Sequence, residues 1–128
     1  MKLLEPKVSK CVENEILKAY YDNCFANSIF DKNIDKFIVL KDITFDSCIF
    51  KNIDFSNIDL EDIDLVEVIF ENCDLSNKKF DYKLIERVKF IDCKMLGTSF
   101  IESSIKILVL IIVLVNILIF LLQKLKIC

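Results

Sequence analysis

An apolar residue stands at every fifth position from Phe45 to Ile105, without an exception. All seven phenylalanines of this span share that phase: Phe45, Phe50, Phe55, Phe70, Phe80, Phe90 and Phe100. A period of five is neither the 3.6 residues of an α-helix nor the two of a β-strand, so it indicates a stacked repeat. The pattern constrains the architecture strongly, but it names no reaction.

A second register of apolar or small residues lies two positions before the first. It contains Ile43, Cys48, Ile53, Ile58, Ile63, Val68, Cys73, Val88, Cys93 and Thr98. Residues two apart in an extended chain point to the same face, so each unit is expected to direct two side chains inward. Most other positions are polar and are expected to face water. Asn52, Asn57, Asn72 and Asn77 follow the extended triplet, where asparagine tolerates a tight corner.

These units resemble the pentapeptide-repeat family, whose motif is loosely A-(D/N)-L-x-x. The clearest matches are Ile53–Asn57, Ile58–Asp62, Ile63–Leu65 and Cys73–Asn77. The resemblance implies an all-β repeat fold, a right-handed, four-sided β-helix of about three to four coils with about twenty residues per coil. On that model residues twenty apart stack at the strand spacing of about 4.8 Å, as in the ladder Phe50–Phe70–Phe90.

The β-helix is expected to cover residues 24–105, with two irregular parts. Lys78 and Lys83 occupy inward positions, and a buried lone lysine is costly, so residues 76–87 are expected to loop outward or bulge, with the five-residue phase kept from Leu75 to Phe90. Residues 24–44 are expected to form a degenerate first coil, because Asp35 breaks the phase.

Residues 1–23 are expected to hold a short helix that covers the open end of the stack. Ser9 is a candidate N-cap, and Val12, Ile16 and Tyr20 would then share one stripe of the helix. Such a cover protects strand edges that a repeat stack otherwise leaves unpaired.

Residues 107–122 are apolar except for Asn116. As a helix they measure about 24 Å, somewhat short of the ~30 Å hydrocarbon core of a bilayer. We predict a single transmembrane helix over residues 106–123, followed by a short tail, 124–128. The alternative is that the β-helix continues, since Leu110, Val115 and Phe120 keep the five-residue phase. Its outward faces would then be apolar, which is unusual for a soluble monomer.

The distribution of basic residues predicts the orientation in the membrane. Four basic residues lie between Arg87 and Lys106, and two follow the apolar run, which favours a repeat domain on the cytoplasmic side. The first residues lack the apolar core of a signal peptide. The expected localisation is therefore a single-pass, tail-anchored membrane protein.

Charge divides the repeats into two halves. Residues 42–74 carry ten acidic residues and one lysine, whereas residues 77–104 carry six basic and four acidic residues. The acidic half suggests a partner-binding face made of Asp54, Asp59, Glu61, Asp64 and Asp74. In the basic half, Lys89, Lys94 and Lys106 are candidates for contact with lipid headgroups.

Nothing in the composition points to catalysis, a cofactor or a metal. The chain has no histidine, one glycine and six cysteines without a C-x-x-C pair. These counts argue against general base catalysis by histidine, phosphate-binding loops and zinc sites. On the twenty-residue coil that the resemblance implies, Cys73 and Cys93 are stacked neighbours and close enough for a disulfide, but packing as small apolar side chains is the favoured interpretation.

We therefore expect a membrane-anchored, non-catalytic scaffold that binds an unknown protein and no nucleic acid. One alternative is a subunit of a membrane assembly, a homo-oligomer joined through the tail helix, with Asn116 as an interhelical contact. Another alternative follows from the resemblance: some pentapeptide-repeat proteins mimic DNA and inhibit a topoisomerase, and the acidic half resembles such a surface.

Overall fold

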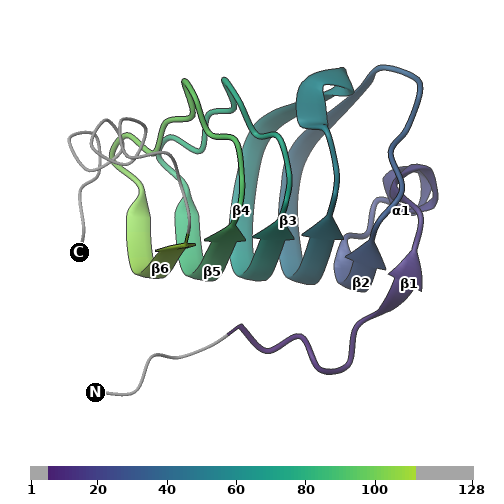
Figure 1. The fold of residues 1–128 in the computed structure, drawn as a ribbon, viewed down its shortest axis with the longest axis horizontal. Coiled ribbons are helices and arrows are strands. Elements are labelled where there is room, and N and C mark those ends of the chain that lie inside the picture. Colours follow the sequence, from purple (N-terminus) through teal and green to yellow (C-terminus); the bar gives the residue numbers. More distant parts are fainter. Residues whose placement is uncertain (1–5, 112–128) are drawn as a thin grey trace.

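A parallel β-sheet wound into coils makes up most of the chain (Figure 1). The computed structural model describes residues 6–111, with side chains described as far as Ile105. The elements in order are β1 (Val12–Asn14), α1 (Ile16–Asp22), β2 (Ala26–Phe30), β3 (Ile38–Lys51), the 3₁₀ turn η1 (Phe55–Asn57), β4 (Ile58–Glu71), β5 (Leu84–Ile91) and β6 (Ser104–Ile111). The strands pair in the order β1-β2-β3-β4-β5-β6, so each coil contacts the next along the sequence.

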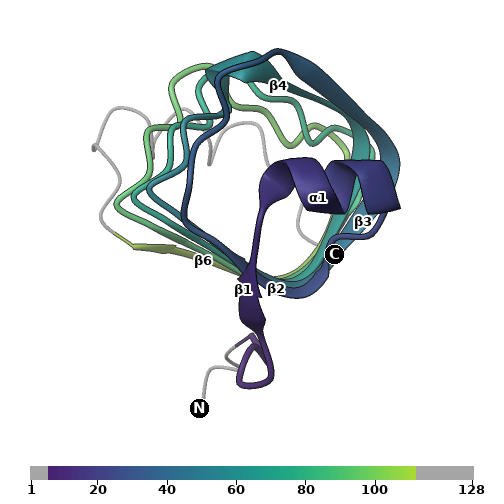
Figure 2. The same ribbon diagram turned by 90° about the vertical axis from the view of Figure 1, so that its right-hand side faces the viewer.

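Residues twenty apart pair throughout the coils from β2 onward. Phe50 pairs with Phe70, and Phe70 pairs with Phe90, each in parallel register. The same separation joins β2 to β3 and β5 to β6. Viewed along the stack, successive coils superimpose as a ring (Figure 2). The predicted twenty-residue stacking is therefore confirmed.

The corners of the coils are left-handed backbone positions. From Asp42 to Glu102 a positive φ recurs every five residues, with Asn57 as the one exception. Asn52, Asn72 and Asn77 were predicted at corners, and all three have a φ between 52° and 63°. Asn57 instead ends the 3₁₀ turn η1, so its backbone makes the corner in a different way.

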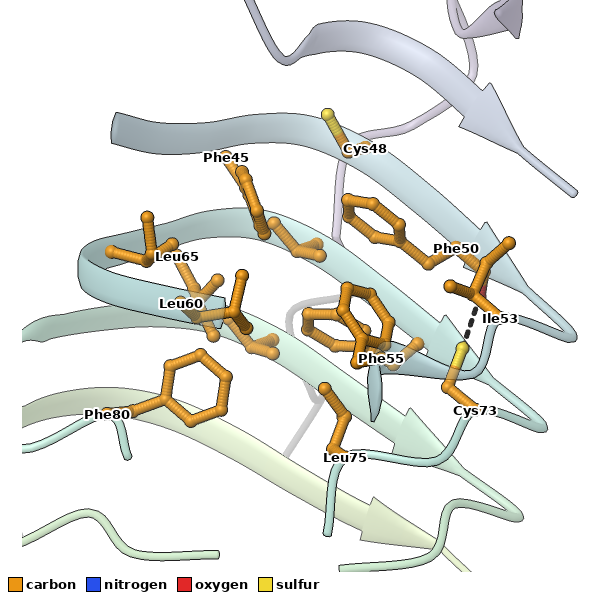
Figure 3. Packing of buried hydrophobic residues seen from close by; sticks show 14 of the residues in the cluster. Phe45, Cys48, Phe50, Ile53, Phe55, Leu60, Leu65, Cys73, Leu75 and Phe80 are labelled. Carbon is orange, nitrogen blue, oxygen red and sulfur yellow. Dashed lines mark hydrogen bonds between the residues drawn. The ribbon is translucent and has the colours of Figure 1, made fainter. Parts of the chain in front are cut away.

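Both inward registers form one continuous core (Figure 3). Every phenylalanine of the main register is at most 2% exposed, and Cys48, Cys73 and Thr98 of the second register are buried beside them. The rings of Phe50, Phe70 and Phe90 stack at centroid distances of 5.2 and 5.1 Å. Burial of these aromatic columns is the main stabilising term of the fold.

The outward loop or bulge expected over residues 76–87 is wrong, because Phe80 and Ile85 remain fully buried in the core. Lys79 pairs with Ser99 and Leu84 with Ser104, so this part of the coil keeps the twenty-residue register. The two lysines are half-buried and turn their ammonium groups to the preceding coil. Lys78 Nζ donates to the carbonyl of Ile58 at 2.7 Å, and Lys83 Nζ lies 3.1 Å from a carboxylate oxygen of Asp62. Each charge therefore has a partner, which removes the reason for a loop.

The N-terminal end is covered by a helix, but not the one expected from Ser9. Residues 12–14 form strand β1, which pairs with Ser28–Phe30, and α1 begins at Ile16 with Glu15 in the N-cap position. Ile16 and Ala19 of α1 are buried, and the helix lies across the end of the ring (Figure 2). Residues 12–14 therefore pair with the edge of β2 as a strand, where the sequence pattern predicts the first turn of a helix.

Strand β6 occupies the beginning of the segment predicted to cross a membrane. Residues 104–111 pair in register with Leu84–Ile91, so the predicted helix of residues 106–123 is wrong over 106–111. Pairing with β5 gives the backbone N–H and C=O groups of these residues hydrogen-bond partners without a helix. The remainder, 112–123, lies outside the described residues. Within the described part of the chain, no helix has the length and apolarity needed to cross a bilayer.

Candidate functional site

The five acidic residues predicted as one face lie on three sides of the coil. Asp54 pairs with Asp74 on one side. Asp59 and Glu61 lie after η1, opposite Val39 and Lys41 of the neighbouring coil, and Asp64 lies beyond the corner at Asp62. Two turns therefore separate these groups, and a partner that contacts one flat side meets only some of them.

Several of these carboxylates also stabilise the turns of the fold. Asp54 accepts a hydrogen bond from the backbone N–H of Ser56 at 2.9 Å, and Asp74 accepts one from Ser76 at 3.0 Å. Asp64 accepts from the N–H of Leu84, one coil further on, at 2.9 Å. Partial burial alone would raise the pKa of Asp74, but these Ser76 bonds and the nearby Lys94 hold it below its usual value.

One side of the coil carries a compact array of polar groups, which we call the polar ladder. Its members are Asn52, Asp54, Asn72, Asp74, Asp92 and Lys94. Together with Ile53 and Cys73 they line a shallow hollow. Asn72 Nδ2 donates to Asn52 Oδ1 at 2.7 Å, and Asp74 pairs with both Asp54 and Lys94 along the stack. The coil repeat thus sets the spacing of these groups.

Asn33 extends the polar ladder into the first coil. Its Nδ2 donates to the backbone carbonyl of Asn52 at 3.0 Å, and its Oδ1 accepts from the N–H of Asp54 at 2.7 Å. This asparagine substitutes for strand pairing where β2 has ended. Sequence analysis missed Asn33 because it lies in the segment where the five-residue phase is broken.

The comparison with protein families adds direct evidence about the repeats. The family model of pentapeptide repeats matches residues 40–80 in eight copies. Over these residues the chain is similar to pentapeptide repeats. In the structure the same register continues beyond them, through β5 and β6. No curated protein matches the chain.

The basic residues of the later repeats lie on more than one side of the coil, and some of them contact the coil before them. Lys78, Lys83 and Arg87 contact the coil before them, at Ile58, Asp62 and Glu67 respectively. Of the candidate headgroup contacts, Lys94 belongs to the polar ladder, whereas Lys89 pairs with Ile69 on the adjacent side. The backbone of Lys106 pairs with Glu86, and its side chain lies outside the described part. Asn116 lies outside the described residues as well.

The buried cysteines of the repeats act as core residues and as weak donors. Cys73 Sγ donates to the carbonyl of Phe50 at 3.2 Å, as Figure 3 shows, and Cys93 Sγ donates to Phe70 at 3.3 Å. Both are free thiols. The neighbouring Cys93 thiol and burial raise the pKa of Cys73. Burial raises the pKa of Cys48 to about 12. A thiol held neutral in this way is a poor nucleophile.

The polar ladder is suited to recognition by hydrogen bonds and charge. It offers amide donors and acceptors, carboxylates and one ammonium group on a rigid sheet side. Among residues 6–111, no group of three or more potential metal ligands lies together.

Proposed function

We propose that this chain is a non-catalytic binding protein whose repeats present the polar ladder to a protein partner. The supporting observation is the in-register array of Asn52, Asn72, Asp54, Asp74 and Lys94 on one side of a rigid stack. Pentapeptide repeats are a family that often interacts with proteins, and this chain contains eight matched copies. The other two acidic sides serve mainly solubility and turn formation.

The rigidity of the stack makes this surface suitable for recognition. Side chains fixed by neighbouring coils lose little conformational freedom when a partner binds, which lowers the entropic cost of association. The Asn72–Asn52 amide bond and the Ser56 and Ser76 caps hold these side chains before any partner arrives. Charge complementarity to mixed carboxylate and ammonium groups then gives specificity.

The test compares two variants with equal numbers of conservative changes. The first carries Asp54→Asn, Asp74→Asn and Lys94→Gln, which remove charge from the polar ladder. The asparagine side chains can still accept the hydrogen bonds from the backbone N–H groups of Ser56 and Ser76. The second carries Asp59→Asn, Glu61→Gln and Asp64→Asn on the other sides. Affinity capture with chemical cross-linking is expected to lose specific partners only with the first variant. Equal retention in both variants would contradict the proposal.

We also propose that the apolar segment after β6 attaches the protein to a membrane. The support is its composition: residues 112–122 are apolar except for Asn116. As a helix these eleven residues measure about 17 Å, which suits an interfacial segment better than a full span of ~30 Å. Cell fractionation with an alkaline carbonate wash tests this attachment. The chain is expected in the membrane fraction, and a protein found only in the supernatant would refute it.

A further inference from the structure

The N-terminal residues cross several coils of the stack. Residues 6–14, which we call the strap, run beside β2, β3 and β4 (Figure 1). Residues 12–14 pair with β2, and Cys11 Sγ donates to the carbonyl of Ser47 at 2.8 Å. Further toward the N-terminus, the backbone N–H of Lys7 donates to Glu67 Oε2 at 2.9 Å, and Pro6 is buried. The strap thus contacts three successive coils.

Glu67 is an unusual residue at the end of this path. It is 5% exposed although it carries a carboxylate, and its backbone φ is 58° at a corner of the coil. A left-handed conformation costs roughly 1–2 kcal/mol for most residues but less for asparagine, which occupies several other corners. In Glu67 two hydrogen bonds of the side chain offset this backbone cost. Its Oε2 accepts from the backbone N–H of Lys7, and its Oε1 accepts from Nε of Arg87.

The strap is held by far fewer contacts than the coils beneath it. Its strand β1 has three residues paired with β2, and two hydrogen bonds hold the part before it. Strands β3 and β4, in contrast, pair over twelve positions. Segments with few backbone bonds and little buried apolar surface open at lower free energy than the core.

We propose that the strap opens as a unit while the coils stay folded, and that Glu67 is its latch. Coils in a repeat stack contact only their neighbours, so a strap that reaches the third coil ties together coils that do not touch. Its opening exposes the outer edge of β2 and separates residues 6–10 from Asn27, Ser47 and Glu67, with which they line a shared hollow.

The experiment uses the purified full chain and limited digestion with trypsin. The sites of interest are the bonds after Lys7 and Lys10, both within the strap. The test variant is Glu67→Asn, because asparagine suits the corner but is too short to keep both partners. The matched control is Glu86→Gln, which also removes a carboxylate bound to Arg87 but makes no contact with the strap. Intact-mass spectrometry follows each cut, and thermal unfolding reports on the coils.

The proposal expects slow cleavage at Lys7 and Lys10 in the native chain and in Glu86→Gln. In Glu67→Asn it expects cleavage about tenfold faster at a temperature well below the unfolding transition, where the coils remain folded. Equal cleavage rates in Glu67→Asn and the native chain would overturn the role of Glu67. Cleavage that occurs only together with loss of the coils would overturn independent opening.

Discussion

Thr98 donates a hydrogen bond of 2.7 Å from its hydroxyl to the backbone carbonyl of Leu75, in the preceding coil. The same relationship over 23 residues recurs at Cys73, Cys93 and Ser103, whose donors reach Phe50, Phe70 and Phe80. The second inward register therefore has two uses. Its aliphatic members fill the core, and its small polar members join one coil to the next.

Replacing Thr98 by valine should destabilise the fold by about 1 kcal/mol, since one buried hydrogen bond is lost. The loss is moderate because the Leu75 carbonyl also accepts from the N–H of Lys78. Urea unfolding of the purified chain measures this difference. Thr44→Val, at an exposed outward position, is the control and should leave stability unchanged. A Thr98→Val variant as stable as the native chain would argue against this role.

Gly97→Ala should cost about 1–2 kcal/mol of unfolding free energy. Gly97 has a φ of 78°, and a Cβ there would overlap Oδ1 of Asn77, at the same corner of the preceding coil. The double variant Gly97→Ala with Asn77→Gly should recover the part due to this overlap, while the backbone strain remains. Full recovery, or no initial loss, would show that the corner tolerates a side chain.

Cys48 should make the fold sensitive to alkaline pH. Burial raises the pKa of its thiol to about 12, against about 8.5 in an unfolded chain. Between these values the unfolded state has released the proton and the folded state has not, so stability falls as pH rises. The slope is up to about 1.4 kcal/mol per pH unit for this thiol. Below pH 8 the thiol contributes no pH dependence.

The measurement compares denaturant unfolding of the native chain and Cys48→Val from pH 8 upward. Valine matches Val68, which pairs with Cys48 one coil further on, so the core should accept it. The variant should lose less stability at high pH than the native chain. Cys24→Ser, at an exposed position, is the control and should behave like the native chain. Parallel pH curves for Cys48→Val and the native chain would disprove the assignment.

The coil itself was predictable because it follows from a local and repeated pattern. Phe50, Phe70 and Phe90 share one phase and one separation, so their stacking follows from the sequence. The corner asparagines were readable for the same reason, since asparagine accepts a positive φ. Tyr82 and Arg87 also occupy corners, with φ values of 58° and 51°. Neither residue type favours a positive φ, so its identity does not predict a corner. There the five-residue period was the better guide.

The strap and the accommodation of the lysines depend on contacts that no period describes. Lys7 and Glu67 are 60 residues apart in sequence, and only the folded chain brings them together. The sequence predicts a loop or bulge at Lys78 because it shows no partner for an inward lysine, whereas in the structure the ammonium group donates to the Ile58 carbonyl. The acidic residues were grouped by sequence proximity, although two turns place them on different sides. In the sequence, the one feature that sets Glu67 apart is that the five-residue period places this glutamate at a corner.

The central claim is that the twenty-residue register continues through β6, in place of a membrane helix beginning at residue 106. Cysteine pairs introduced for Lys89 with Val109, and for Ile91 with Ile111, test this register directly, because each pair lies opposite in β5 and β6. The pair Ile49 with Ile69 in β3 and β4 is the positive control. Backbones in paired strands are close enough for a disulfide.

Mild oxidation followed by peptide mapping reads out the bonds formed. The account predicts disulfides in both β5–β6 pairs and in the control, and far fewer in the offset combination of Lys89 with Ile111. Formation in the control alone would show that residues 106–111 leave the sheet, and would restore the spanning helix predicted from the sequence.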